Sequence, residues 1–289
     1  MVRKPLSEKE WLAADRWQDL LIALFPNHRY AKAAGAQRKL RLLLCAAVRL
    51  GWDVMPDDRC RRAVEVAERF ANGQATVKQL AAARAVAKEA CNAAIGERNR
   101  QERLSHKEFD QRLRAAGGAE EWSNRWPSDL AVPYAEQLRA EFAARIVVCA
   151  AAESISVAVV ESGLMFVPDV VISVEELAAR MPEWHEVGTS DPPDPRPDLV
   201  RDVFGYPFAP VKFVVSWRTD TVTALAEAIV GDGAFDRLPI LADALEEAGC
   251  DNQRLLDHCR AAGPHVRGCW AVDVVRGDHW QPGARTRGR

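Results

Sequence analysis

Five residues that can bind a transition metal lie close together near the end of the chain. They are three cysteines and two histidines within twenty residues: Cys250, His258, Cys259, His265 and Cys269. Structural zinc is held at the corners of a tetrahedron by thiolates, imidazoles or carboxylates, so this 250–269 cluster is a candidate zinc or iron site. The cluster contains no Cys-x-x-Cys pair, which common zinc sites have. Ordinary packing of these side chains, without a metal, is therefore the alternative.

Basic residues on two neighbouring helical segments form a second candidate site. They are Arg38, Lys39, Arg41, Arg59, Arg61 and Arg62. Lysine and arginine on adjacent helices can follow a phosphate backbone, which is the electrostatic basis of nucleic-acid binding. The formal net charge of the chain is −2, and Asp53, Asp57 and Asp58 lie among these basic residues. Both observations disfavour nucleic acid as a partner.

Aromatic residues indicate a third candidate surface. The chain has nine tryptophans, most of which we expect in the core. Trp122 and Trp126 differ because they lie in a segment bounded by glycine and proline. Tryptophan is enriched at the centres of protein interfaces, so this pair is a candidate partner-binding site.

Motifs for catalysis are absent from the sequence. There is no Gly-x-Ser-x-Gly nucleophile motif and no glycine-rich phosphate loop. The cysteines lack the local sequence signatures of catalytic cysteines. The sequence therefore favours a protein that is not an enzyme, and it assigns no catalytic residue. It calls for no cofactor other than the zinc ion considered above.

Helical periodicity governs the segments that carry these residues. Leu40, Leu43, Leu44 and Ala47 follow the i, i+3, i+4, i+7 spacing of one helix face, and so do Val222, Leu225, Ala226 and Ile229. We expect helices over 7–21, around 40–47, over 57–71, 76–95 with a polar extension to 114, 133–149, 155–159, 220–229, 238–245 and 251–259, and after Gly268. The predicted fold is mainly α and multi-helical, with two packed helical subdomains and little or no β-structure.

Charge and proline content suggest where the subdomains divide. Residues 1–150 contain 26 lysines and arginines against 19 acidic residues, whereas residues 151–289 contain 13 against 22. Residues 186–198 are acidic and include four prolines, which disfavour regular structure. We predict a basic helical subdomain over 1–185, an acidic linker over 186–198, an acidic subdomain of short helices over 199–280 and a basic tail over 281–289.

The compartment is inferred from the cysteines and the apolar runs. Seven cysteines in 289 residues are too few for a disulfide framework. The first residues show no signal-peptide pattern, and the longest apolar run, 142–160, contains Arg145 and Glu153. We therefore expect a cytoplasmic protein with no membrane partner.

Three stretches of the chain resemble a known group of proteins. They are residues 37–45 with 61–69, residues 199–208 (Leu-Val-Arg-Asp-Val-Phe-Gly-Tyr-Pro-Phe), and residues 234–250 with His258-Cys259-Arg260 and 265–273. Together they resemble a family of uncharacterised bacterial paralogues, some loosely labelled SMI1/KNR4 and others accompanying repeat or kinase domains. In that family the segment after the Arg-Lys-Leu-Arg stretch is often rich in cysteine, whereas here it reads Cys45-Ala46-Ala47-Val48. The resemblance implies no established activity and transfers no catalytic residues.

These observations leave three hypotheses for the function. The first is a non-catalytic helical module for protein interaction or regulation, an immunity-like role included, with an unknown protein partner. The second is a zinc- or iron-binding protein that uses the 250–269 cluster. The third is a nucleic-acid-binding protein that uses the basic helices near the N-terminus.

Overall fold

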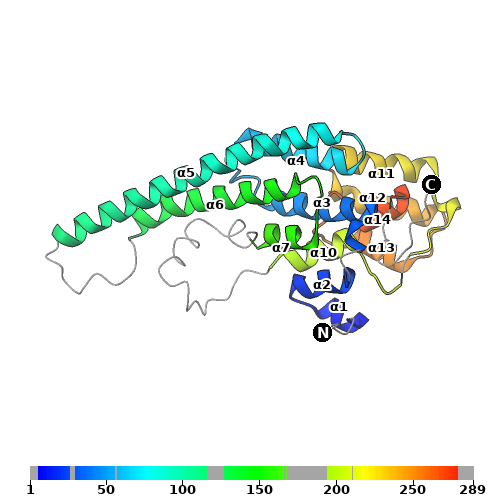
Figure 1. Ribbon diagram of the computed structural model, residues 1–289. Helices are drawn as coiled ribbons and strands as arrows, with labels where there is room; N and C mark the ends of the chain where they lie inside the picture. The colour runs from blue at the N-terminus through cyan, green and yellow to red at the C-terminus, as the bar shows by residue number, and fades with distance from the viewer. Residues whose placement is uncertain are drawn as a thin grey trace. The chain divides into compact units, whose positions relative to one another are not determined.

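The computed structural model describes residues 6–26, 30–55, 57–115, 127–165, 167, 194–209 and 211–278. These residues form twelve α-helices and a few short 3-10 turns, and they contain no β-strand (Figure 1). The mainly α, multi-helical fold predicted from the sequence is therefore confirmed. All seven cysteines are free thiols.

The chain forms two compact units that are discontinuous in sequence. Unit 1 takes its described residues from Met1–Ala46, Ser154–Ala158 and Pro195–Arg289, and unit 2 takes them from Ala47–Glu153 and Val159–Asp194. This differs from the predicted division into 1–185 and 199–280. Contacts over long sequence separations explain the difference: the Lys39 ammonium hydrogen-bonds to the carbonyl oxygens of Val203 (2.7 Å) and Gly268 (2.8 Å). The predicted linker, 186–198, lies mostly outside the described residues, and its last three residues belong to a helix that begins at Arg196.

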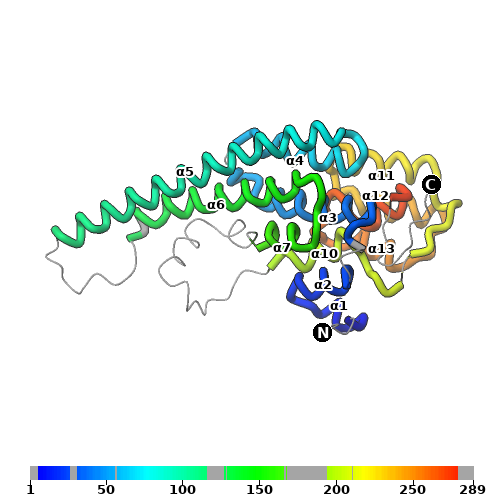
Figure 2. Tube along the Cα trace, in the orientation of Figure 1, coloured from blue at the N-terminus to red at the C-terminus, as the bar shows by residue number. Residues whose placement is uncertain are grey.

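Unit 2 is built from three long helices. They are α4 (Asp58–Ala71), α5 (Val77–Ala115) and α6 (Ser128–Ala150), and α5 packs along α6 and α4 (Figure 2). A capping box begins α5, since the Gln79 amide donates to Thr76 Oγ1 (3.2 Å) and the Thr76 amide donates to Gln79 Oε1 (2.8 Å). Helix α6 begins five residues before the predicted start and includes Pro133.

Short helices make up unit 1, and most of them begin or end at residues that favour a helix terminus. They are α1 (Glu8–Ala13), α2 (Trp17–Leu24), the first part of α3 (Ala34–Leu50), α10 (Arg196–Phe204), α11 (Asp220–Asp232), α12 (Leu238–Glu247), α13 (Gln253–Arg260) and α14 (Trp270–Arg276). Helix α7 (Val157–Leu164) begins in unit 1. Thr219 caps α11 and Asn252 caps α13, each one residue away from the aspartate predicted to begin the helix.

The core of unit 1 joins the last four helices. Its buried side chains include Ile229 of α11, Leu241 of α12, Leu255 of α13 and Val275 of α14. The apolar stripes predicted for these segments thus face one another. The backbone carbonyls and side chains at the ends of α10, α13 and α14 are thereby held in one region of unit 1, where the candidate site lies.

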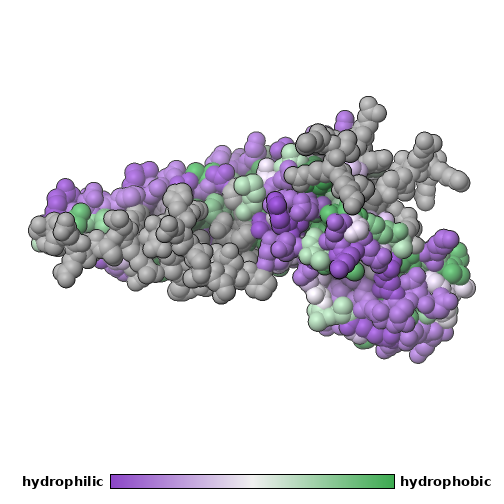
Figure 3. Space-filling model, turned by 90° about the horizontal axis from the view of Figure 1, so that it is seen from below, coloured by the Kyte–Doolittle hydropathy of each residue, from purple (hydrophilic) through white to green (hydrophobic). Residues whose placement is uncertain are grey.

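The outer surface carries few large apolar side chains. Figure 3 shows one face, on which hydrophobic residues form small patches among hydrophilic ones. The most exposed large hydrophobic residue among those described is Val215, at 78%. No helix formed by the described residues combines the length and the apolar character needed to cross a bilayer.

Candidate metal centre

Four side chains from three segments of unit 1 meet with their metal-binding atoms together. They are Asp202 of α10, His258 of α13, His265 of the loop that follows α13, and Cys269, the residue before α14. One ligand atom from each lies within 4.8 Å of all the others. The site is interior, because the side chains of Asp202, His265 and His258 are 3%, 7% and 19% exposed and Cys269 is fully buried.

Helix α10 brings an aspartate into the core. Leu199, Asp202 and Val203 follow i, i+3, i+4 spacing, so they lie on one face of the helix, and all three are buried. The helix ends at Gly205, whose φ of +69° favours glycine. A Cβ atom there would lie 2.7 Å from Cγ of Trp270, so glycine also permits the close approach of α14.

The loop between α13 and α14 is fixed to this aspartate. The Val266 amide donates to Asp202 Oδ2 at 3.0 Å, and His265 Nδ1 lies 2.8 Å from Asp202 Oδ1. The other ring nitrogen of His265, Nε2, lies 3.1 Å from the carbonyl oxygen of Ala261. The His265 ring is therefore held at both nitrogens, at Nδ1 by Asp202 of α10 and at Nε2 by the carbonyl group of Ala261.

His258 completes the group from the last turn of α13. Its Nε2 atom lies 3.2 Å from Asp202 Oδ1 and 3.2 Å from Cys269 Sγ. The ring also contacts the rings of His265 and Trp270, each with a centroid distance of 4.8 Å. One imidazole nitrogen thus faces both an oxygen and a sulfur ligand atom.

The hydrogen bonds of His265 fix which nitrogen carries a proton. A carbonyl oxygen only accepts hydrogen bonds, so Nε2 must donate its N–H to Ala261. In a neutral imidazole, Nδ1 then has a lone pair, and that lone pair faces the carboxylate of Asp202. Two lone pairs at 2.8 Å repel each other unless a proton or a metal ion lies between them.

The titration behaviour of the group reflects its burial and its charges. Burial by itself raises the pKa of Asp202, but the hydrogen bonds of His258 and His265 outweigh this effect and lower it. Burial lowers the pKa of His265, and the hydrogen bond to Asp202 reverses this and raises it. Burial, with a smaller contribution from the Asp202 charge, raises the pKa of the Cys269 thiol well above its ordinary value. In the absence of a metal, Asp202 is therefore ionised and Cys269 is a neutral thiol at pH 7.

The ligand atoms lie somewhat closer together than those of a tetrahedral zinc site. Zinc–nitrogen and zinc–oxygen bonds of about 2.0–2.1 Å place two such ligand atoms about 3.3 Å apart, and a zinc–sulfur bond of about 2.3 Å places sulfur about 3.6 Å from nitrogen. The observed separations of 2.8 Å (His265 Nδ1 to Asp202 Oδ1) and 3.2 Å (His258 Nε2 to Asp202 Oδ1 and to Cys269 Sγ) are hydrogen-bond distances. They are about 0.1–0.5 Å shorter than the zinc values, so these side chains would move slightly apart around an ion. A dication with one carboxylate and one thiolate also gives a neutral site, which burial favours.

Three of the five residues predicted to bind metal meet in this group, and two do not. Cys250 and Cys259 are buried in the apolar core of unit 1 and are not members of the group. Burial raises the pKa of Cys259 to about 12, so it behaves as a small hydrophobic residue. Asp202 was missed because it lies far from the cluster in sequence. A charged residue on the apolar stripe of Leu199 and Val203 was the signal that could have identified it.

The basic residues proposed for nucleic acid do not form one exposed surface. Lys39 and Arg41 are buried, which corrects the prediction that they face a partner. Arg38, Arg59 and Arg61 are paired with Asp273, Asp57 and Asp58, respectively, and Arg62 is exposed. Trp122 and Trp126, the predicted partner-binding pair, lie outside the described residues.

Comparison with known proteins identifies no relative of this chain. No protein-family model, no curated protein and no solved structure matches it. The resemblance to the SMI1/KNR4-labelled family therefore stays a prediction, and the function must be argued from the site.

Proposed function

We propose that this protein binds a structural zinc ion through Asp202, His258, His265 and Cys269. The observation that carries the proposal is the orientation of His265, whose Nε2–H donates to Ala261 while Nδ1 faces Asp202. Histidines that bind metals usually donate their second ring N–H to a carbonyl or a carboxylate, which fixes the tautomer. His265 has this arrangement.

The ligand types favour zinc among the common metals. Two imidazoles, one thiolate and one carboxylate are borderline, soft and hard ligands, respectively, and zinc accepts all three kinds in a tetrahedron. Calcium and magnesium prefer oxygen ligands only, so a site with one carboxylate does not suit them. Iron remains the alternative metal carried over from the sequence.

The number of ligands favours a structural role. Four protein ligands fill a tetrahedral site, whereas catalytic zinc keeps one position for water or substrate. The side chains are also largely withdrawn from solvent. A zinc ion here links α10, α13 and α14, which fits the non-catalytic protein expected from the sequence.

The test is elemental analysis of protein expressed with added zinc and purified without a polyhistidine tag. We expect about one zinc per chain. X-ray absorption at the zinc edge is expected to show one sulfur ligand and three nitrogen or oxygen ligands. Three sulfur ligands would favour binding by Cys250, Cys259 and Cys269 and would contradict the geometry. Less than a tenth of an equivalent of zinc, before and after incubation with zinc, would overturn the proposal, and stoichiometric iron would overturn the choice of metal.

A further inference from the structure

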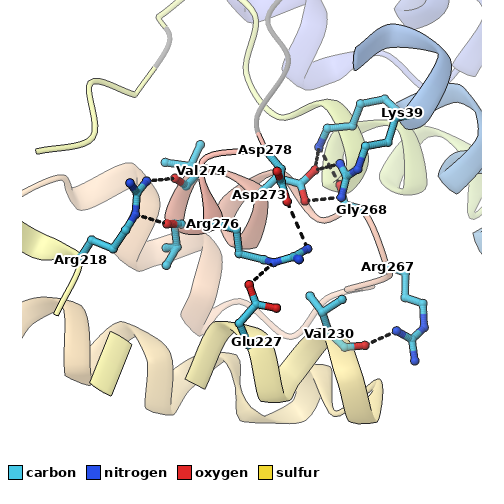
Figure 4. Close-up of polar contacts among 12 residues, drawn as sticks. Lys39, Arg218, Glu227, Val230, Arg267, Gly268, Asp273, Val274, Arg276 and Asp278 are labelled. Carbon is cyan, nitrogen blue, oxygen red and sulfur yellow. Dashed lines mark hydrogen bonds and ion pairs between the residues drawn. The ribbon is translucent and has the colours of Figure 1, made fainter. Parts of the chain in front are cut away.

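A buried lysine lies next to the candidate zinc site and contacts the chain on both sides of it. Lys39 of α3 is 1% exposed. Its ammonium nitrogen lies 2.7 Å from the Val203 carbonyl oxygen. It also lies 2.8 Å from the Gly268 carbonyl oxygen and 2.6 Å from Asp273 Oδ2 (Figure 4). An ammonium group has three N–H donors, so all of them are used.

The two carbonyl groups belong to neighbours of zinc ligands. Val203 directly follows Asp202, and Gly268 directly precedes Cys269. Asp202 lies on α10 and Cys269 directly precedes α14, and the two ligands are more than sixty residues apart in sequence. A single ammonium group therefore joins the backbone segments that carry the oxygen and the sulfur ligands.

Asp273 compensates the charge of this lysine and aligns it with α14. Its carboxylate also receives a two-point interaction from Arg38, with distances of 2.5 Å and 2.9 Å. The Asp273 amide donates to the Cys269 carbonyl oxygen at 3.1 Å, so the carboxylate is held one helical turn from the ligand. The position of the ammonium is thus set with respect to Cys269 by two independent contacts.

The packing around Gly268 leaves this lysine little freedom. Gly268 has a φ of +97°, and a Cβ atom there would lie 2.9 Å from Cβ of Leu42, on the same helix as Lys39. The backbone before Cys269 therefore lies directly against α3. Helix α3 contributes no ligand to the group, yet it contacts the residue beside one ligand through both Leu42 and Lys39.

We propose that Lys39 is a positioning residue for the metal centre, which sets the separation between Asp202 and Cys269 through the carbonyl groups of Val203 and Gly268. This inference rests on the proposed zinc site. It explains why a lysine is buried at this point, where a hydrophobic residue would otherwise be expected. It also makes zinc affinity depend on a helix that supplies no ligand.

The experiment compares zinc binding by the full chain and two variants, Lys39→Met and Leu40→Ala. Methionine has a similar length but no donors, whereas Leu40 is a buried neighbour on the same helix that lies outside the ligand group. Zinc affinity is measured by competition with a chelator, and the absorption spectrum of bound Co²⁺ reports ligand geometry. Circular dichroism identifies conditions in which both variants are folded.

We expect Lys39→Met to bind zinc about 10–100-fold more weakly and to change the Co²⁺ spectrum, as loss of outer contacts does in other zinc sites. Leu40→Ala, although destabilised, is expected to stay within about threefold of the original affinity with an unchanged spectrum. Equal affinity and spectra in the original protein and Lys39→Met would overturn the positioning role and leave the zinc site intact. Absence of zinc binding by the original protein would instead overturn the proposed function.

Lys39→Arg keeps the test decisive if Lys39→Met does not fold. Arginine retains the positive charge beside Asp273, but its planar guanidinium cannot direct three donors to the same three acceptors. We expect weaker zinc binding and a changed Co²⁺ spectrum in this variant too. Original affinity and spectrum in Lys39→Arg would overturn the inference.

Discussion

Two buried cysteines allow a matched test of whether the zinc site stabilises unit 1. Cys259 and Cys269 are both fully buried and belong to the same apolar core. Only Cys269 belongs to the ligand group. Each cysteine-to-alanine replacement removes one sulfur atom from the same core. A difference in stability between the two variants in the presence of zinc therefore isolates the contribution of the metal.

The expected magnitudes follow from burial and from mass action. Without metal, each cysteine-to-alanine change is expected to cost about 1 kcal/mol, as loss of one buried methyl-sized group does. A zinc ion that binds the folded state only, present at 100 times its dissociation constant, adds about 2.7 kcal/mol of stability. For a unit of about 150 residues, this raises the unfolding temperature by roughly 8 °C.

Scanning calorimetry at pH 7.5, once with EDTA and once with zinc, measures these shifts. The original protein and Cys259→Ala are expected to gain about 8 °C on addition of zinc, and Cys269→Ala is expected to gain nothing. With EDTA, the two variants should unfold at similar temperatures. The reasoning is refuted if zinc raises the unfolding temperature of Cys269→Ala as much as that of Cys259→Ala, or if it does not stabilise the original protein.

Two further predictions concern packing and charge in the metal-free protein. Gly205→Ala places a Cβ atom 2.7 Å from Trp270 Cγ and should lower the free energy of unfolding by about 2–5 kcal/mol. Gly96→Ala in α5, where nothing lies within 4 Å, should raise it by about 0.5–1 kcal/mol. Urea unfolding that gives the two variants equal stability contradicts this packing. Burial raises the pKa of Asp273, but the positive charges of Lys39 and a neighbouring arginine outweigh burial, so the pKa is lowered. The ionised carboxylate therefore stabilises the folded protein above about pH 4, and this contribution is lost as the pH falls through the lowered pKa. Asp273→Asn should therefore be about 3–5 kcal/mol less stable than the original protein at pH 7, and this gap should narrow below about pH 4; a gap in urea stability that is constant down to pH 3 contradicts the assignment.

Local signals in the sequence were sufficient to predict most of the helices. The start of α5, expected at residue 76, is determined by Thr76 and Gln79, which lie within one turn of each other and form a capping box. The apolar stripe of α12 at Leu238, Leu241 and Leu245 is fully buried as expected. Caps and stripes depend on residues a few positions apart, so the sequence alone shows them.

Contacts between distant segments could not be predicted in this way. Lys39 was assigned to a basic surface because the residues around it are also basic, but its partners lie at Val203, Gly268 and Asp273. The composition of the neighbouring sequence does not indicate partners so far away along the chain. The same limitation caused the division at residues 186–198 to separate segments that belong to one unit.

Some residues of the candidate site could be predicted from the sequence, and others could not. His258, His265 and Cys269 lie close in sequence, and their metal-binding chemistry was visible from residue types. The spacing of these residues could not exclude Cys259 as a metal ligand, because a helical residue next to a ligand can point toward the site or away from it. Cys259 shares the apolar face of its helix with Leu255, which favours ordinary packing, and in the structure both residues lie in the apolar core of unit 1.

Charge balance explains how the interior of unit 1 could accommodate this group with and without a metal. Without zinc, a proton between His265 Nδ1 and Asp202 Oδ1 would oppose the negative charge of Asp202, and Cys269 is a neutral thiol. A bound zinc ion would replace the proton between His265 and Asp202 and the proton of the Cys269 thiol. Two protons would leave and one zinc dication would enter, so the net charge of the buried group is unchanged. The large cost of placing a net charge in the interior therefore does not arise in either state.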